Sequence, residues 1–326
     1  MNKLISSISP HFNSNITTTK IMLDVIIALV PAAIASAVIF GMRSLLVIGV
    51  CVAMCIFSEW GFEKICKKKN TISDLSAVVT GMLLAFNLPV SIPLWQAAFG
   101  SIVAIVVVKQ LFGGIGQNFA NPAITARIVM MTAFSGTMTS WVFPDAASSA
   151  TPLALITKGQ TDALPPYLNM FLGYHGGCLG ETCTLALLIG GIYLLVKRVI
   201  SWHTPVAFIG TVAVMSLICG KDVLYQLMAG GLMIGAWFMA TDYSTSPVTL
   251  NGQLVYGVGC GIITVLIRYF GGFPEGVSYA ILLMNLCSWA IDKAFHRHQF
   301  GVSKEDIAAE KAAKKAAKQA AKEAAK

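Results

Sequence analysis

Long apolar runs alternate with short polar connections along almost the whole chain. A membrane-spanning α-helix needs roughly 20 predominantly apolar residues, and most of the runs come close to that length. They predict about ten spanning helices, at about 21–42, 44–60, 73–88, 93–111, 120–136, 181–196, 204–220, 224–240, 253–270 and 274–294. The fold class that this pattern indicates is an all-α polytopic membrane protein.

Two of the runs are better candidates for broken helices than for straight spans. The run at 73–88 is short and ends in Asn87-Leu88-Pro89. The run at 224–240 is followed by the polar stretch from Thr241 to Pro247. Short or interrupted helices at corresponding positions of two halves are typical of transporter-like folds, where they border the binding site.

The chain repeats itself with an inverted second half. The offset between Pro89 and Pro247 is 158 residues, and the same offset places Phe112-Gly113-Gly114 on Phe270-Gly271-Gly272. Each half then holds five spans, and an odd number forces the second half to cross the membrane in the opposite sense. We therefore expect two inverted five-helix repeats. The domain boundaries that follow are a leader at 1–20, repeat 1 at 21–136, an outer loop at 137–180, repeat 2 at 181–294 and a tail at 295–326.

Composition and charge agree with a membrane location. Apolar residues make up 56% of the chain and charged residues only 12%, about half of the share in soluble domains. The net charge of +8 comes from basic clusters beside the spans and from the Ala/Lys-rich tail, so it does not indicate nucleic-acid binding. Basic residues concentrate on the cytoplasmic side of membrane proteins. Both termini are therefore expected in the cytoplasm and the loop 137–180 outside.

Candidate chemistry is sparse. The cysteines and histidines lack the spacing of zinc or iron–sulfur sites, and no catalytic residue or metal ligand is predicted. Ionisable residues inside a bilayer default to functional hypotheses, although several here could reach the interface. They are Asp24, Lys109, Arg127, Glu181, Asp242, Arg268 and Asp292. Asp24 and Asp242 are the candidates for cation movement.

Several motifs resemble one family in the right order. They include Ser9-Pro10-His11 with Ile21-Met22-Leu23-Asp24-Val25, Phe112 to Asn118 with Asn121-Pro122-Ala123, Gly176 to Thr182, Phe238 to Asp242 with Ser246-Pro247, and Gly271 to Val277. Together they resemble the RnfD family, the D subunits of Rnf electron-transport complexes, over essentially all of 5–295. The sister family, the B subunits of sodium-pumping NADH:quinone reductases, usually carries a longer N-terminal extension.

The resemblance gives a role to a stretch that is bland by itself. Read alone, Asp145 to Leu153 is a turn or a helix cap. In the family, a Thr in a similar motif carries FMN through a phosphoester, and the matching residue is Thr151. Asp145 and Ser148 match the motif that the flavin transferase recognises, while Ser149 stands where Gly is common. Such a hydroxyl is expected on an accessible loop. The resemblance also implies a second, non-covalent flavin such as riboflavin.

The function implied is that of a flavoprotein subunit in an ion-translocating ferredoxin:NAD oxidoreductase of the bacterial cytoplasmic (inner) membrane. Such a redox-driven Na⁺ or H⁺ pump implies the other Rnf proteins (RnfA, RnfB, RnfC, RnfE and RnfG), a flavin transferase and membrane lipid as partners. Two alternatives remain on fold grounds alone, because fold does not fix function. One is a cofactor-free inverted-repeat channel or secondary transporter, and the other is a purely structural scaffold protein of the complex.

Overall fold

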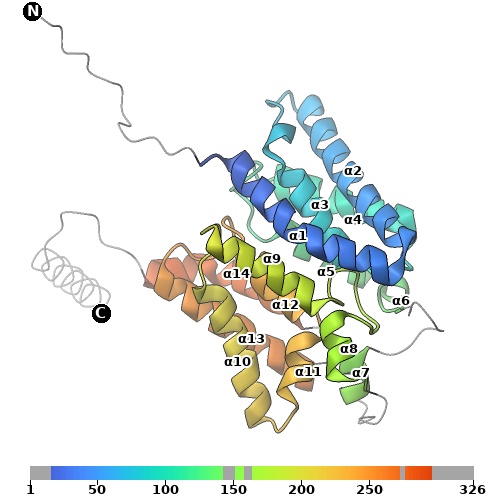
Figure 1. Ribbon diagram of the computed structural model, residues 1–326. Coiled ribbons are helices and arrows are strands. Elements are labelled where there is room, and N and C mark those ends of the chain that lie inside the picture. The colour runs from blue at the N-terminus through green and yellow to red at the C-terminus, as the bar shows by residue number, and fades with distance from the viewer. Residues whose placement is uncertain (1–15, 142–150, 158–163, 272–275, 296–326) are drawn as a thin grey trace, which may run out of the picture.

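The computed structural model describes residues 16–141, 151–157, 164–271 and 276–295. Expectations for the first 15 residues, for 142–150 and for the tail from 296 onward lie outside the described residues. Every regular element within the described ranges is helical (Figure 1), so the all-α class is confirmed for them.

The N-terminal helices form one group, drawn in blue to green in Figure 1. They are α1 (Thr18–Phe40), α2 (Met42–Ile65), the 3₁₀ turn η1 (Ile72–Asp74), α3 (Ser76–Phe86), α4 (Leu94–Ile102) continued by the π-helix η2 (Val103–Gln110), α5 (Pro122–Ala133) and α6 (Ser135–Met138).

The C-terminal helices form a second group, preceded by two short helices. The short ones are α7 (Pro152–Thr157) and α8 (Tyr167–Leu172). The group itself comprises α9 (Thr184–Val196), α10 (His203–Ile218), α11 (Val223–Met228), α12 (Leu232–Ile234) continued by the π-helix η4 (Gly235–Met239), α13 (Leu250–Phe270) and α14 (Val277–Ala294).

Polar caps set the starts of several helices. The Thr17 hydroxyl accepts a hydrogen bond from the first turn of α1, and Thr249 does the same for α13. Asn121 caps α5 with its side-chain oxygen, and Pro122 occupies the first helical position. Such caps satisfy backbone N–H groups that the helix leaves without a partner. They fix these boundaries within a few residues of the apolar runs.

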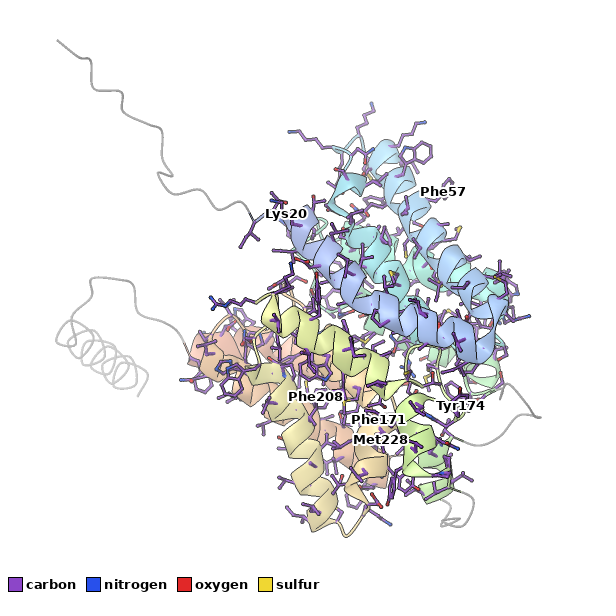
Figure 2. The ribbon with its side chains drawn as sticks, in the orientation of Figure 1. Lys20, Phe57, Phe171, Tyr174, Phe208 and Met228 are labelled. Carbon is purple, nitrogen blue, oxygen red and sulfur yellow. The ribbon has the colours of Figure 1, made fainter. Side chains whose placement is uncertain are left out.

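The outward faces are those of a membrane protein. Among the described residues, α1, α2 and α13 are long and apolar enough to cross a bilayer. Shorter apolar helices are α3, α4 with η2, α5, α9 and α10. Large apolar side chains project outward along these helices (Figure 2), and Val38 is 74% exposed. An apolar surface of this extent marks contact with lipid or with other proteins.

Both predicted broken helices are interrupted. Leu75 has a φ of +64° and separates η1 from α3. The run at 224–240 divides into α11 and α12 at Ala229-Gly230-Gly231, where both glycines have positive φ. Glycine adopts this backbone conformation without the penalty that a Cβ carries. The second break therefore follows from the sequence, whereas Leu75 adopts the left-handed conformation as a bulky residue.

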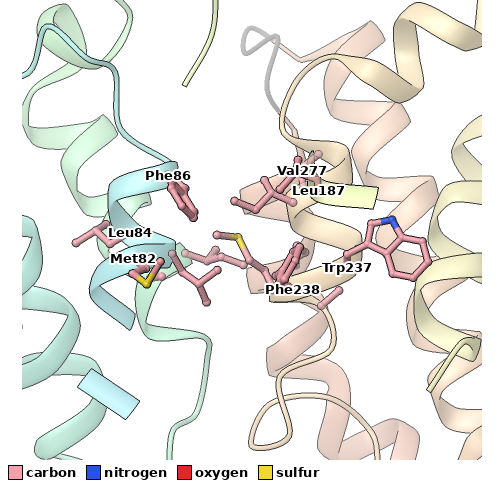
Figure 3. Packing of buried hydrophobic residues seen from close by; sticks show 14 of the residues in the cluster. Met82, Leu84, Phe86, Leu187, Trp237, Phe238 and Val277 are labelled. Atoms are coloured by element: carbon pink, nitrogen blue, oxygen red, sulfur yellow. The ribbon is translucent and has the colours of Figure 1, made fainter. Parts of the chain in front are cut away.

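The two groups meet along helices that are equivalent in the sequence repeat. α1 packs against α9, and α5 against α14. At the first contact, a Cβ on Gly190 would lie 2.1 Å from the backbone oxygen of Ala28, so only glycine permits this approach. Figure 3 shows the apolar core between the groups, where Phe86 of α3 lies opposite Leu187 of α9.

Candidate functional site

Thr151 lies directly before α7 and is buried, with only 4% of its surface exposed. Its hydroxyl oxygen accepts a hydrogen bond from the backbone N–H of Ala154 at 3.3 Å. The expectation of an accessible hydroxyl is therefore wrong for this conformation. Asp145 and Ser148 lie outside the described residues.

Leu153 anchors α7 to the C-terminal group. It forms a small buried cluster with Met170 and Ala229, against which Tyr225 and Met228 pack. These contacts bring Thr151 beside the break between α11 and α12. Thr151, the residue that the resemblance singles out, thus lies near a helix break more than seventy residues away in the chain.

A pocket of about 420 Å³ opens beside α7. Its walls come from α7, from the end of α10, from α11 and from the end of α13, through Leu153, Ile156, Cys219, Lys221, Gln226, Arg268, Tyr269 and Phe270. Cofactor pockets usually measure about 300–1,000 Å³ and combine apolar walls with a few polar groups. The size, the two cations and the two aromatic rings suit a flavin.

Arg268 organises the break that borders this pocket. Its guanidinium donates to the backbone oxygen of Gln226 at 2.6 Å and to that of Ala229 at 2.9 Å. On the other side of the break, the carboxylate of Glu181 accepts the backbone N–H of Gly230. Both charged side chains thus satisfy backbone groups that the interrupted helix leaves open.

A second cavity, of about 470 Å³, lies between the two helix groups. Its lining includes residues from the first turns of α1 and none from α7. Most of its lining is apolar, and its polar residues come from both groups. They are Thr18, Ser76, Thr80, Lys109, Asn118, Asn121, Thr241, Asp242, Tyr243 and Ser244.

Asp242 faces this cavity and Asp24 does not. The half-buried Asp242 carboxylate accepts hydrogen bonds from the hydroxyls of Ser244 at 2.9 Å and Thr245 at 3.1 Å. Asp24 is also half-buried, but its carboxylate accepts from the hydroxyl of Tyr193 at 2.8 Å and so ties α1 to α9. The structure therefore does not bring the two acids together in the cavity.

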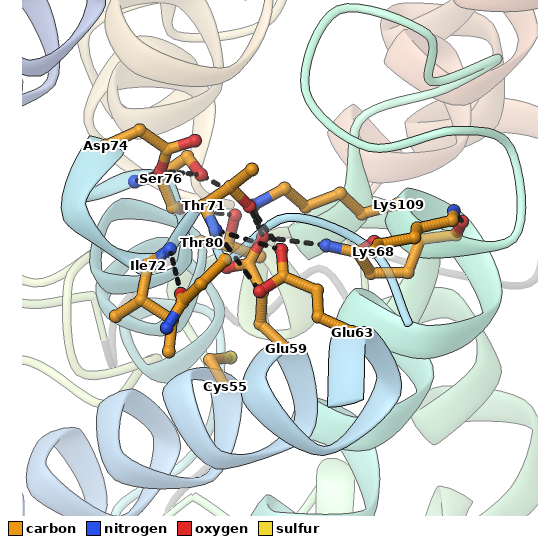
Figure 4. A network of polar contacts seen from close by, with 12 residues as sticks. Cys55, Glu59, Glu63, Lys68, Thr71, Ile72, Asp74, Ser76, Thr80 and Lys109 are labelled. Carbon is orange, nitrogen blue, oxygen red and sulfur yellow. Dashed lines mark hydrogen bonds and ion pairs between the residues drawn. The ribbon is translucent and has the colours of Figure 1, made fainter. Parts of the chain in front are cut away.

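A buried charge cluster lies beside the cavity (Figure 4), and of its charged members the sequence analysis names Lys109 but not the acids Glu59 and Glu63. Glu59 of α2 has no exposed surface, and it accepts a 2.6 Å hydrogen bond from the ammonium group of Lys109, which is 2% exposed. Lys109 also donates to the hydroxyl of Ser76 at 2.5 Å. Glu63, one turn after Glu59, accepts the backbone N–H and the hydroxyl of Thr71.

A helix-face signal could have found these acids. Cys51 and Cys55 share one face of α2 at a spacing of four residues, and Glu59 and Glu63 continue that spacing. The two cysteines are buried, and the acids follow them inward. The span predicted at 44–60 stops before Glu63, close to the basic stretch from Lys64 to Lys69.

Arg127 joins the two groups at a buried polar seam. Its guanidinium donates to the side-chain oxygen of Asn87 at 2.6 Å and to the sulfur of Cys178 at 3.4 Å. Asn121 also crosses the seam, donating to the backbone oxygen of Met239 at 3.3 Å. Residues from α3, from α5, from the loop before α9 and from η4 therefore meet here.

Comparison with known proteins gives a consistent picture. The model of the NQR2, RnfD, RnfE family matches residues 5–301. The chain is 46% identical over 309 residues to the D subunit of the Na⁺-translocating ferredoxin:NAD⁺ oxidoreductase complex of Acetobacterium woodii. That match covers 93% of this chain and 97% of that protein.

Two further relatives agree. The D subunit of the proton-translocating ferredoxin:NAD⁺ oxidoreductase complex of Clostridium ljungdahlii is 41% identical, with 91% of this chain and 96% of that protein covered. The D subunit of the ion-translocating oxidoreductase complex of Stutzerimonas stutzeri is 34% identical, with 86% and 92% covered. The predicted resemblance is confirmed, and the chain belongs to the NQR2, RnfD, RnfE family.

Proposed function

We propose that the chain is the D subunit of an ion-translocating ferredoxin:NAD oxidoreductase complex of the Rnf type. The observation that carries the proposal is the match, end to end, with relatives that bear this name. A complex of this class is a redox-driven translocase. Its partners would be RnfA, RnfB, RnfC, RnfE and RnfG, together with membrane lipid.

The proposed topology is ten membrane spans in two inverted repeats, with both termini on the cytoplasmic side of the inner membrane. Two structural observations support it. The helix pairs α1 with α9 and α5 with α14, which the sequence offset makes equivalent, contact one another across the junction. The interrupted elements η1 with α3 and α11 with α12 occupy the same place in the two halves. Contacts between equivalent helices are expected around a pseudo-two-fold axis.

FMN esterified to Thr151 is the proposed redox group. Bound there, the flavin would supply the electron-transfer chemistry, while the protein supplies its position and electrostatic surroundings. The residues present suit it, because the hydroxyl acceptor lies two residues before Leu153, which lines a pocket of fitting size. Since Thr151 is buried next to α7, the flavin transferase would act on a chain in which this segment is undocked.

The cavity between the helix groups is the proposed place for the second, non-covalent flavin. Its volume of about 470 Å³ falls in the range of cofactor pockets. Its mostly apolar lining with a few polar groups is suited to a neutral flavin such as riboflavin. Lys109 and Asn121 would be hydrogen-bond donors to the carbonyl oxygens of its ring.

Asp24 and Asp242 stay candidates for the cation path. Asp242 is the stronger of the two, because its carboxylate borders the cavity. Asp24 already serves as a tie between two helices. The alternative for the whole chain, a channel or secondary transporter with no cofactor, shares the fold and differs at Thr151.

Covalent flavin distinguishes these functions. The chain is produced in a host with an active flavin transferase, denatured, and viewed in a gel under ultraviolet light, after which the mass of the Thr151 peptide is measured. We expect a fluorescent band and a peptide heavier by one FMN less water. A dark band with an unmodified peptide from that host would favour the transporter.

A further inference from the structure

We propose that the flavin ring on Thr151 occupies the pocket between α7 and the ends of α10 and α13, where Lys221 stabilises its reduced form. The inference rests on the proposed function, because it concerns the flavin attached to Thr151. It adds the location of the ring and the residue that tunes its potential.

The attachment point and the pocket belong to the same short segment. Thr151 precedes α7, and the next turns of α7 place Leu153 and Ile156 in the pocket wall. A group esterified to Thr151 therefore starts two residues before the segment that forms this wall. The cavity between the helix groups shares no lining residue with the pocket.

The opposite wall offers aromatic surface. Tyr269 and Phe270 end α13, and both line the pocket. The Tyr269 hydroxyl donates to the hydroxyl of Ser216 in α10 at 3.4 Å, which ties its ring to the neighbouring helix. Phe270 is 82% exposed. A planar isoalloxazine ring would give this exposed ring a stacking partner, a favourable arrangement for aromatic pairs.

Two cationic side chains line the pocket, and they differ in burial and in their partners. Arg268 is buried and committed to the carbonyl groups of the break between α11 and α12. Lys221 is exposed, and it forms no ion pair with another described residue. Its backbone is fixed, because Gly220 turns with a φ of +65° and the Lys221 N–H bonds to the oxygen of Ser216 at 3.0 Å.

Charge and geometry together assign Lys221 its role. Reduction of a flavin places negative charge on the pyrimidine side of the ring. A cation in a partly apolar pocket favours that state more than it would in water. Lys221 is the pocket cation whose side chain can follow the ring, since Arg268 is held by the backbone. Lys221 acts on the potential of the bound ring, and it does not take part in attachment.

The test uses the complete complex, purified from a host with an active flavin transferase. Lys221→Gln removes the charge, and Lys293→Gln removes an exposed lysine at the end of α14 as a control. Covalent loading is read from the mass of the Thr151 peptide, and the midpoint potential of that flavin from a redox titration. We expect both variants to load as the wild type does. Lys221→Gln alone should shift the potential to more negative values.

A second pair of variants tests the location independently. Phe270→Ala should increase quenching of the flavin's fluorescence by acrylamide, a neutral quencher. Phe112→Ala, at the equivalent position of the first half, should leave the quenching unchanged. This test of the ring's location does not depend on any change in the midpoint potential of the flavin.

Three results would overturn the inference. Unchanged potential and quenching in fully loaded variants would place the ring elsewhere and leave the proposed function standing. Loss of loading in Lys221→Gln would make Lys221 part of the attachment reaction. An unmodified Thr151 peptide in the wild type would overturn the proposed function as well.

Discussion

The buried ion pair between Glu59 and Lys109 allows a quantitative prediction. Replacing Lys109 by Met keeps most of the side-chain volume and removes the charge. Breaking a buried pair by removing one partner costs about 3–5 kcal/mol, because the other charge stays buried. Glu59 keeps a donor from the side-chain amide of Gln110 at 2.8 Å. We therefore expect Lys109→Met to cost about 3 kcal/mol, at the lower end of that range.

Replacing the acid of the pair as well separates the contribution of charge to stability from the contribution of packing. Glu59→Gln removes the negative charge, so the ammonium of Lys109 stays buried with neutral partners such as the hydroxyl of Ser76. The double variant leaves neither charge. Replacing both members of a buried pair is often neutral, so the double variant should be more stable than Lys109→Met. The coupling energy of the cycle is expected at about 2–3 kcal/mol.

Unfolding of the purified chain in mixed micelles, followed by circular dichroism during a titration with sodium dodecyl sulfate, measures these differences. Lys64→Met is the control, because Lys64 is an exposed lysine of α2 and should change stability by less than about 0.5 kcal/mol. If Lys109→Met and Glu59→Gln each cost under about 1 kcal/mol and simply add, the pair does not act as a desolvated ion pair.

Further predictions concern packing, attachment and transport. Gly190→Ala should cost about 1–3 kcal/mol in the same titration, since its Cβ would meet the backbone of α1. Gly210→Ala, on an open helix face, should stabilise by about 0.5–1 kcal/mol; equal effects would contradict the close contact. Thr151→Ala should insert normally but carry no covalent flavin, and unchanged electron transfer by its complex would rule out the role. Asp242→Asn should slow or uncouple ion uptake into vesicles, and Asp24→Asn should do so if it lies on the path. Full coupled transport in both would leave them structural.

Helices could be read from the sequence because lipid imposes a simple pattern. The run expected at 21–42 is α1 at Thr18–Phe40, and the run at 253–270 is α13 at Leu250–Phe270. The run at 224–240 is predicted to be a broken helix. Gly230 and Gly231, both with positive φ, provide the backbone conformation at the break. Composition and local backbone preference carry all of this information.

The environment of single side chains could not be read in the same way. Thr151 is buried at the start of α7, whose Leu153 packs against Ala229 from a segment far away in the chain. Glu59 is buried and paired with Lys109, which lies fifty residues away in the chain. The sequence therefore identified Thr151 as a candidate through the resemblance, but neither its burial nor the acid cluster of α2.

Ionisable residues within spans fall into two classes once the helix breaks are known. Backbone groups freed by a break must find partners, because lipid offers none. Arg268 and Glu181 meet this need at the break between α11 and α12, so their burial has a structural cause. Asp242 and Lys109 differ, because both line the cavity between the helix groups. The rule that a charge within the membrane signals function is therefore strongest for these two residues, one from each half of the chain.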